Sequence, residues 1–356
     1  MVQSNHPIGV GLIGYGFVGK TFHAPLIGAV EGLDLCAVVS GDASKVHADL
    51  PDVTIYPETK AMLADPAIEL VVIATPNETH APLAKAALAA GKHVVLDKPF
   101  ALDLTEARAV TQLAVDANRL LCVFHNRRWD SDYLTVSAAV EAGTIGDVVH
   151  FESHIDRFRP DVRDRWRERA GPGAGIWFDL GPHLIDQALQ LFGLPDRVLA
   201  SLAAQRSGAQ IDDWAHVILS YGRRRVILHA SMLVAGGTHR FVVQGTRGTL
   251  VKHAADPQES QLLAGMTPGT VGWGEDPDPL VVHDGVGASR EQPSLRGDQR
   301  QFYVAMAAAL AGSGPPPVSM LEALAVMAVL DAAKRSSDDG KAIELPLCSE
   351  ERVQWR

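Results

Sequence analysis

Short runs of apolar residues alternate with longer amphipathic stretches through the first part of the chain. Compact runs rich in β-branched residues are typical of buried strands, whereas apolar residues that recur every three to four positions are typical of helices. Because strands and helices follow one another with short links, the pattern predicts a parallel, doubly wound sheet with right-handed crossovers. The predicted strands are Ile8–Ile13, Leu35–Val39, Leu70–Ala74, His93–Leu96 and Leu120–Phe124, and the predicted helices are Pro82–Ala90 and Leu104–Ala117, the latter with Asp103 or Thr105 as N-cap.

After about Arg128 the pattern changes to longer strand-like runs in which apolar and polar residues partly alternate. Such alternation is typical of an antiparallel sheet that covers its core on one face only. We therefore expect two domains, residues 1–126 with the parallel sheet and residues 127–356 with a mainly antiparallel sheet packed on helices. The predicted elements of the second domain are the strands Val148–Phe158, Val198–Gln205, Trp214–Tyr221, Arg225–Met232 and Arg240–Gln244, a hairpin turn at 245–248, loops around 257–279 and 312–317, and a helix at Leu321–Ser336.

The composition is that of a globular protein with a full core, since 47% of the 356 residues are hydrophobic and 21% are charged. The formal net charge of −10 argues against nucleic acid as a partner, because binding to phosphates needs a basic face. Arginines crowd residues 157–169, but acidic residues are interleaved with them, so we interpret most of this segment as internally paired. No apolar run reaches the roughly 20 residues that span a bilayer, and no membrane association is expected.

The start of the chain and the cysteines indicate in which cellular compartment the protein is expected. Residues 1–7 lack the basic and apolar regions of a signal peptide. The three cysteines, Cys36, Cys122 and Cys348, are odd in number and far apart, and the first two lie in apolar runs. Buried free thiols are therefore expected for these two, rather than disulfides or a metal site. We expect a cytoplasmic protein without a bound metal.

A glycine-rich segment, Gly14-Tyr15-Gly16-Phe17-Val18-Gly19, directly follows the first predicted strand and precedes a helical segment. In that context glycines allow a tight turn and close approach of the backbone to a pyrophosphate, which then faces a helix N-terminus. The segment therefore predicts a dinucleotide site, with Gly14, Gly16, Phe17 and Val18 at the cofactor.

The end of the second strand bears on the choice of cofactor. NAD enzymes usually carry an acidic residue there, which holds the ribose diol and would repel a 2′-phosphate. Ser40 occupies this position, Asp42 lies two residues later, and Lys45 is within reach of a phosphate. The sequence favours NADP over NAD.

The turn Thr75-Pro76-Asn77 ends the strand Leu70–Ala74, with His80 one helical turn further on. A helix cap and a turn explain these residues without any ligand. Polar side chains at a strand end also make Thr75 and Asn77 candidates for contacts with the ribose and nicotinamide, and we place His80 in the same candidate site. The two interpretations are compatible.

The tripeptide Asp97-Lys98-Pro99 closes the strand His93–Leu96. In an open α/β sheet the carboxyl ends of the strands face the ligand crevice. Proline fixes φ and withdraws a backbone donor, so the chain leaves the sheet on a defined course. Lys98 is therefore predicted to meet a substrate oxygen.

Asp179 and His183 form a second charged pair. If their segment is helical, the spacing of four places both side chains on one face, and a carboxylate beside an imidazole can orient it for proton transfer. Glycines at 171, 173 and 175 precede the pair and permit close approach of a ligand. The nearby Trp166-Arg167 is open to a second interpretation, as packing plus a salt bridge.

Together these segments resemble the glucose–fructose oxidoreductase/inositol dehydrogenase family, called Gfo/Idh/MocA. The resemblance spans nearly the whole chain, and within the family it is closest to the branch of NADP-dependent scyllo-inositol dehydrogenases. Many members have Glu where this chain has Asp97. The segments that carry the resemblance are Gly14–Gly19, Phe22-His23-Ala24-Pro25-Leu26, Ala74-Thr75-Pro76-Asn77, Gly91-Lys92-His93-Val94, Asp97-Lys98-Pro99, His125-Asn126-Arg127-Arg128-Trp129-Asp130 and Arg165-Trp166-Arg167-Glu168.

The resemblance implies a Rossmann domain followed by an α/β domain with a large open sheet, which commonly mediates assembly into dimers or tetramers. It implies that Lys98 polarises the reacting oxygen and that Asp179 and His183 form the proton-transfer pair. It also implies a set of residues that line the cofactor and substrate: Gly14, Gly16, Ser40, Thr75, Asn77, Asp97, Asn126, Trp166 and Arg167.

The resulting hypothesis is reversible oxidation of a secondary alcohol on a small polyol or sugar, with an inositol as the first candidate. Two alternatives stay open at this point. One is a regulator that binds a dinucleotide or sugar without turnover, and the other is a biliverdin- or imine-reducing member of the same family. The sequence names neither the sugar nor its stereochemistry, and it does not give the physiological direction.

Overall fold

The computed structural model describes residues 6–355, and its contacts divide the chain into two compact units. Unit 1 comprises Met1–Asn126, Gln258–Trp273 and Asp298–Ala323. Unit 2 comprises Arg127–Pro257, Gly274–Gly297 and Leu324–Arg356. The interpretation of the chain start as lacking a signal peptide rests largely on residues 1–5, which lie outside the described residues.

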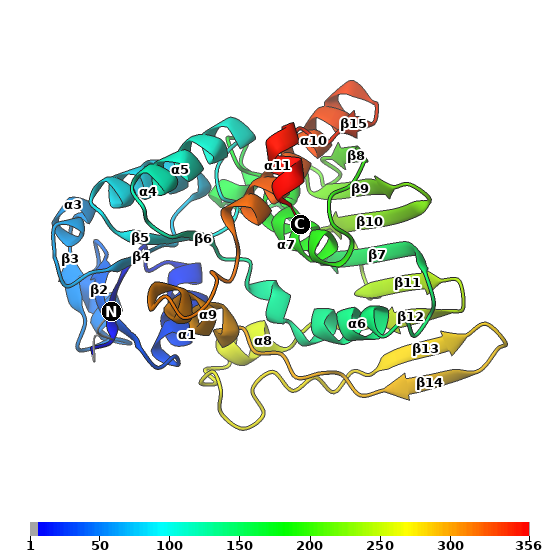
Figure 1. The fold of residues 1–356 in the computed structure, drawn as a ribbon, viewed down its shortest axis with the longest axis horizontal. Coiled ribbons are helices and arrows are strands. Elements are labelled where there is room, and N and C mark those ends of the chain that lie inside the picture. The colour runs from blue at the N-terminus through cyan, green and yellow to red at the C-terminus, as the bar shows by residue number, and fades with distance from the viewer. Residues whose placement is uncertain (1–5, 356) are drawn as a thin grey trace. The chain divides into compact units, whose positions relative to one another are not determined.

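Unit 1 contains a six-stranded sheet in the order β3-β2-β1-β4-β5-β6, and every neighbouring pair is parallel (Figure 1). The predicted doubly wound sheet is confirmed, and two of the five predicted strands have the predicted bounds. The short edge strand β3 was not predicted. The strands are β1 (Ile8–Ile13), β2 (Leu33–Val39), β3 (Thr54–Tyr56), β4 (Leu70–Ile73), β5 (His93–Leu96) and β6 (Leu121–Val123).

Helices of unit 1 link these strands, and the two longest between strands lie close to their predicted positions. In α5 the Asp103 carboxylate accepts a hydrogen bond from the backbone N–H of Glu106 at 2.8 Å, which satisfies one of the free donors of the first turn. The segment 257–279, expected to be a loop, contains the short helix α8. The helices are η1 (Gly19–His23), α1 (Ala24–Gly28), α2 (Ala43–His47), α3 (Thr59–Leu63), η2 (Asn77–Thr79), α4 (His80–Ala89), α5 (Leu104–Asp116), η3 (Asn126–Trp129, whose first residue alone belongs to unit 1), α8 (Gln258–Leu263) and α9 (Arg300–Leu310).

Unit 2 is built on a nine-stranded sheet in the order β14-β13-β12-β11-β7-β10-β9-β8-β15. Only β7 and β10 pair in parallel, so the expectation of a mainly antiparallel sheet is confirmed. Figure 1 shows these strands as a row of arrows from β8 in green to β14 in yellow, with β7 between β10 and β11. The strands are β7 (Val148–Asp156), β8 (Arg197–Ala203), β9 (Trp214–Tyr221), β10 (Arg224–Ser231), β11 (Phe241–Gly245), β12 (Gly248–Lys252), β13 (Leu280–Asp284), β14 (Ser289–Gln292) and β15 (Ile343–Glu344).

The two faces of this sheet differ in chemistry. Helix α7 (Ile176–Phe192) packs against β7, β9 and β10, and the ring of its Phe192 lies 5.2 Å from that of Phe151. Fully buried residues such as Val217 and Leu228 face this side, whereas alternate positions point to the opposite side, which we call the outer face. The other helices of unit 2 are α6 (Ser131–Glu141), η4 (Trp166–Glu168), α10 (Met320–Asp339, whose first four residues belong to unit 1) and α11 (Ser349–Gln354).

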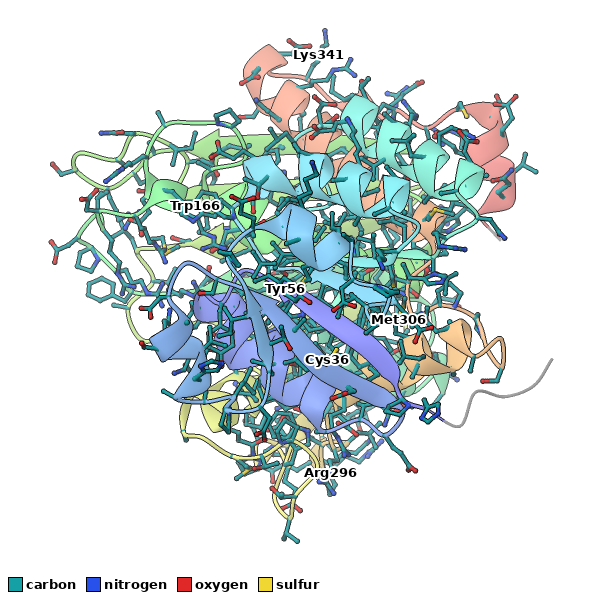
Figure 2. All side chains as sticks on the ribbon, turned by 90° about the vertical axis from the view of Figure 1, so that its left-hand side faces the viewer. Cys36, Tyr56, Trp166, Arg296, Met306 and Lys341 are labelled. Atoms are coloured by element: carbon teal, nitrogen blue, oxygen red, sulfur yellow. The ribbon has the colours of Figure 1, made fainter. Side chains whose placement is uncertain are left out.

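The three cysteines are free thiols, and the prediction of a buried thiol is confirmed for Cys122 but not for Cys36. Cys122 is buried, Cys348 is exposed, and Cys36 is half-buried on β2, beside the strand that carries Tyr56 (Figure 2). Within residues 6–355, no helix combines the length and the apolar character that a membrane crossing requires.

Candidate active site

The glycine-rich loop joins β1 to η1, and two of its glycines are required by packing. Gly14 has a φ of +97°, and a Cβ at this position would lie 2.6 Å from the carbonyl oxygen of Ala74. A Cβ at Gly19 would collide with the Gly14 carbonyl oxygen, whereas one at Gly16 would meet nothing within 4 Å. The loop is therefore tightly packed on the protein side and open at Gly16, as a site for a pyrophosphate requires.

Ser40 follows β2, and Asp42 has a structural function close to it. The Asp42 carboxylate caps α2 by accepting a hydrogen bond from the backbone N–H of Lys45 at 3.0 Å. The Ser40 hydroxyl accepts a hydrogen bond from the Asp42 backbone N–H at 3.1 Å. The acidic side chain nearest to the strand end is thus already used as a helix cap.

His80 connects the ends of two neighbouring strands. Its ring is fully buried, with Nε2 at 2.9 Å from the carbonyl oxygen of Thr75 and Nδ1 at 2.8 Å from that of Pro99. Thr75 follows β4 and Pro99 follows β5, so one imidazole fixes the two loops that carry candidate site residues. The structure places His80 as a support of these loops, while Asn77 lies buried at the start of η2.

Asp97 interacts with a buried pair of side chains, His23 and Tyr303, which sequence reasoning did not find. Asp97 is 4% exposed, and its carboxylate interacts electrostatically with both His23 and Tyr303. His23 Nδ1 lies 2.6 Å from the hydroxyl oxygen of Tyr303. Burial lowers the pKa of His23 to about 4, although the Asp97 carboxylate opposes the shift. Lys98, next in the chain, is partly exposed, and its peptide bond to Pro99 is cis.

Asn126 lies at the end of unit 1 in a chain of buried amides. Its Nδ2 donates a hydrogen bond of 2.9 Å to Oε1 of Gln299, whose backbone N–H donates to the Gln258 side chain at 2.7 Å. All three side chains are at most 5% exposed. This places Asn126 next to segments that return to unit 1 from far along the chain, which the sequence pattern did not indicate.

In unit 2 the predicted pair Asp179 and His183 lies on α7, so the helical spacing of four is confirmed. The Asp179 carboxylate pairs with Nε of Arg167 at 3.4 Å, and the Arg167 guanidinium lies 4.4 Å from the ring centroid of Trp166. Trp166, labelled in Figure 2, is the first residue of η4. The ion pair and the cation–π contact thus join Trp166, Arg167 and Asp179. His183 lies one turn after Asp179 on the same helix.

A pocket in unit 2 is lined by Asp179 and Arg167 together with residues that were not predicted. Arg206, buried in this wall, pairs with Glu168 at 3.0 Å and with Asp213 at 2.8 Å, which anchors η4. Asp212 caps α7, because its carboxylate accepts a hydrogen bond from the Trp177 backbone N–H at 2.9 Å. Burial raises the pKa of the Asp212 carboxyl, and the backbone hydrogen bonds oppose this shift.

The candidate residues of unit 1 share one edge of the sheet. The Gly14 loop, Ser40, Thr75 and Lys98 follow β1, β2, β4 and β5, which are adjacent in the order β2-β1-β4-β5. The strand order reverses between β1 and β4, and crevices at such a switch point bind nucleotides in open α/β sheets. Fold and loop together define a dinucleotide-binding protein of the Rossmann class.

Comparison with known proteins identifies the family. Residues 8–125 match the model of the oxidoreductase family with an NAD-binding Rossmann fold, and residues 137–345 match that of its C-terminal alpha/beta domain. The chain therefore belongs to the Gfo/Idh/MocA family of oxidoreductases, and it has an NAD(P)-binding domain.

Individual relatives agree over nearly the full length. The uncharacterized oxidoreductase YdgJ of Escherichia coli is 50% identical over 93% of this chain and 96% of its own length. The scyllo-inositol 2-dehydrogenase (NADP(+)) IolW of Bacillus subtilis is 35% identical over 95% of this chain and 96% of its own. A crystal structure from Klebsiella pneumoniae superposes with a TM-score of 0.94 at 56% identity, covering 99% of each chain.

Proposed function

We propose that this oxidoreductase is an NADP-dependent dehydrogenase that oxidises a secondary alcohol of a polyol or sugar, with an inositol as its first candidate substrate. The observation that carries the proposal is the position of Lys98, which follows the carboxyl end of β5 beside the loops of the switch point. The similarity to a scyllo-inositol 2-dehydrogenase supports the choice of substrate class.

The residues at the switch point fit a nicotinamide dinucleotide. The open side of Gly16, with Phe17 and Val18 at the start of the following helix, would receive the pyrophosphate, and Thr75 and Asn77 would contact the ribose and nicotinamide. When bound, the nicotinamide accepts or returns the carbon-bound hydrogen together with its electron pair. Stabilisation of the oxygen's charge and transfer of the hydroxyl proton are assigned to side chains of the protein.

Lys98 is proposed to stabilise negative charge on the substrate oxygen. As the hydroxyl loses its proton, the ammonium group donates a hydrogen bond to the developing alkoxide. A donor held in place before reaction costs no reorganisation at that moment, so its contribution falls on turnover more than on binding. The buried Asp97 on one side and the ring of Pro99 on the other restrict the backbone at Lys98.

His183 is proposed to take the hydroxyl proton, with Asp179 one turn earlier as the residue that orients the imidazole. In the direction of reduction His183 returns this proton to the oxygen. Arg167 pairs with the Asp179 carboxylate at 3.4 Å and so holds it in place. A charged Asp179 would in turn stabilise the protonated imidazole that forms during oxidation.

Ser40 supports the preference for NADP. An acidic residue at this strand end would repel the 2′-phosphate, whereas a hydroxyl leaves room for it. Asp42 does not take over the acidic function, because its carboxylate caps α2. Lys45 lies in the first turn of α2 and supplies a positive charge close to the strand end.

We further propose that copies of the protein assemble into a dimer or tetramer through the outer face of the unit 2 sheet. Leu199, Ile218 and Ile227 lie side by side across β8, β9 and β10 on this face, and Leu199 is 42% exposed. An apolar row across neighbouring strands is a surface that a second copy can cover.

The test of the proposed function is absorbance of the reduced nicotinamide with NADP or NAD and a panel of inositols, glucose, xylose and related polyols. Turnover of at least one polyol, with NADP preferred, is the expected result. Confirmed NADPH binding without turnover of any polyol would favour a regulator instead, and turnover of an imine or biliverdin alone would favour the other reductase type.

A further inference from the structure

A cluster of histidine and carboxylate side chains lies on the outer face of the unit 2 sheet, on the side of β7 and β10 away from α7. Residues at alternate positions of a strand share a face, so His154 and Asp156 of β7 point the same way. His229 of β10 pairs in register with His154 on the neighbouring parallel strand. One ligand atom from each of these three side chains lies within 4.8 Å of the others.

The distances between these atoms suit a bound metal ion. Nδ1 of His154 lies 3.5 Å from Oδ2 of Asp156, and Nε2 of His229 lies 3.7 Å from Oδ1 of Asp156. Tetrahedral zinc with bonds of about 2.0–2.1 Å places its ligand atoms roughly 3.3–3.4 Å apart. The two distances involve different oxygens of Asp156, so side-chain rotations are needed to bring one oxygen and the two nitrogens to ligand distance.

The second nitrogen of each histidine is already engaged, which turns the first toward Asp156. Nε2 of His154 lies 3.0 Å from the Glu152 carboxylate, and when it donates there, the lone pair of the neutral ring lies on Nδ1. Nδ1 of His229 lies 3.4 Å from Nδ1 of His216, which leaves Nε2 toward Asp156. A histidine ligand whose other nitrogen contacts a carboxylate is a common arrangement around protein-bound zinc.

Two of these atoms are buried and make no hydrogen bond, although each lies within 4 Å of an oppositely charged group. Nδ1 of His154 and Oδ1 of Asp156 have no hydrogen-bond partner among residues 6–355. The Asp156 side chain is 2% exposed, and burying a carboxylate is costly unless a positive charge compensates it. A lone pair that faces a carboxylate oxygen is repelled by it, so this arrangement needs a positive charge, which either a proton on Nδ1 of His154 or a bound cation supplies.

We propose that His154, Asp156 and His229 form a site for one divalent cation of the zinc class. Two imidazoles and one carboxylate are ligands that suit Zn²⁺, and three protein ligands leave the fourth position to water. The Glu152 carboxylate orients His154, and Thr238 orients Asp156 through a hydrogen bond of 2.6 Å from its hydroxyl. The cation links β7 to β10, on the face opposite the helix that carries Asp179 and His183.

The test is titration of the full-length, chelator-treated protein with Zn²⁺ alone, followed by calorimetry and by metal analysis after gel filtration. The wild type is expected to bind one Zn²⁺ per chain. His154→Ala and His229→Ala are expected to lower the affinity by more than the roughly 10–100-fold that losing an orienting neighbour costs, and Glu152→Gln by about that amount. His283→Ala, which removes an exposed histidine on β13, is the matched control.

A second variant separates metal binding from misfolding. Asp156→Asn keeps the side-chain shape and removes the charge, and circular dichroism reports whether each variant is folded. Zn²⁺ is expected to raise the Tm of the wild type and of His283→Ala but not of folded Asp156→Asn. Absence of Zn²⁺ binding by the wild type, or equal binding by all variants, would overturn the proposal. The histidines and carboxylates would then be paired through protons alone.

Discussion

The imidazole of His80 lies within hydrogen-bond distance of two backbone carbonyls, that of Thr75 after β4 and that of Pro99 after β5. The residues that we assign to nicotinamide binding and to charge stabilisation follow these same two strands. A buried side chain thus ties together the two loops that carry Asn77 and Lys98. The conformation of the unit 1 site depends on this support.

Replacing His80 should therefore destabilise the protein. In His80→Leu both carbonyls lose the ring that faces them inside the core, and at least one of them loses its hydrogen-bond donor, which costs about 1–3 kcal/mol. Urea unfolding should show a free energy of unfolding lower by at least about 1 kcal/mol. His47→Gln, at an exposed position on α2, should stay within about 0.5 kcal/mol of the wild type. Equal stability of the two variants would show that His80 is not a support.

A charge at position 40 should reverse the cofactor preference. In Ser40→Asp the carboxylate would repel the 2′-phosphate of NADPH and accept hydrogen bonds from the ribose diol of NADH. We expect the Kd for NADPH to rise at least about tenfold, which corresponds to about 1.4 kcal/mol. Ser40→Ala, which adds no charge, should keep the preference for NADPH. Fluorescence titration measures both constants, and an unchanged ratio in Ser40→Asp would contradict the proposed NADP site.

His23 should make stability depend on pH below neutrality. Its pKa is lowered by burial from 6.5 to about 4, so between these values the unfolded chain binds a proton that the folded protein does not. The free energy of unfolding therefore rises with pH through this window. The contribution of His23 to this rise is roughly 3 kcal/mol, and it does not change at higher pH.

Two variants isolate this contribution. His23→Gln removes the titrating group and keeps an acceptor for the Tyr303 hydroxyl, so its free energy of unfolding should vary less between pH 4.5 and 6.5 than that of the wild type. Tyr303→Phe removes the hydrogen bond but retains the buried imidazole, and it should keep the wild-type slope. The idea fails if His23→Gln shows the same slope as the wild type.

If copies assemble through the outer face, a charge introduced on this face should disrupt the oligomer, whereas a charge on the opposite face of the sheet should not. Leu199→Arg places a charge in the apolar row and should shift the protein to monomers in analytical ultracentrifugation. Val149→Arg, at a position that is 43% exposed on the other face, should leave the assembly intact. If Leu199→Arg sediments as the wild type does, assembly uses another surface.

The regular elements were predictable where a strand carries a clear apolar pattern, either continuous or alternating as in Trp214–Tyr221. Ile8–Ile13 and His93–Leu96 have the predicted bounds, because a continuous apolar run ends where the strand leaves the core. The edge strand Thr54–Tyr56 was missed, since three partly exposed residues carry no such signal. The helix α8 was missed because prolines and glycines dominate the segment around it.

The candidate site could be predicted only where local motifs carry it. The glycine-rich loop, Lys98 and the helical spacing of Asp179 and His183 are all readable within a few residues. The contact of His23 with Tyr303 joins residues 280 positions apart, and nothing local to either residue indicates it. The outer-face cluster has a partial signal in the alternation of His150, Glu152, His154 and Asp156, but the registered partner His229 becomes evident only when the strands pair.

The central claim is that Lys98 stabilises charge on the substrate oxygen, and turnover of Lys98→Ala tests it most directly. With the best polyol of the panel, kcat should fall about 10²–10³-fold, while the Kd for NADPH stays close to that of the wild type. Lys60→Ala, an exposed lysine on α3, should behave as the wild type does. Undiminished turnover in Lys98→Ala would contradict the account.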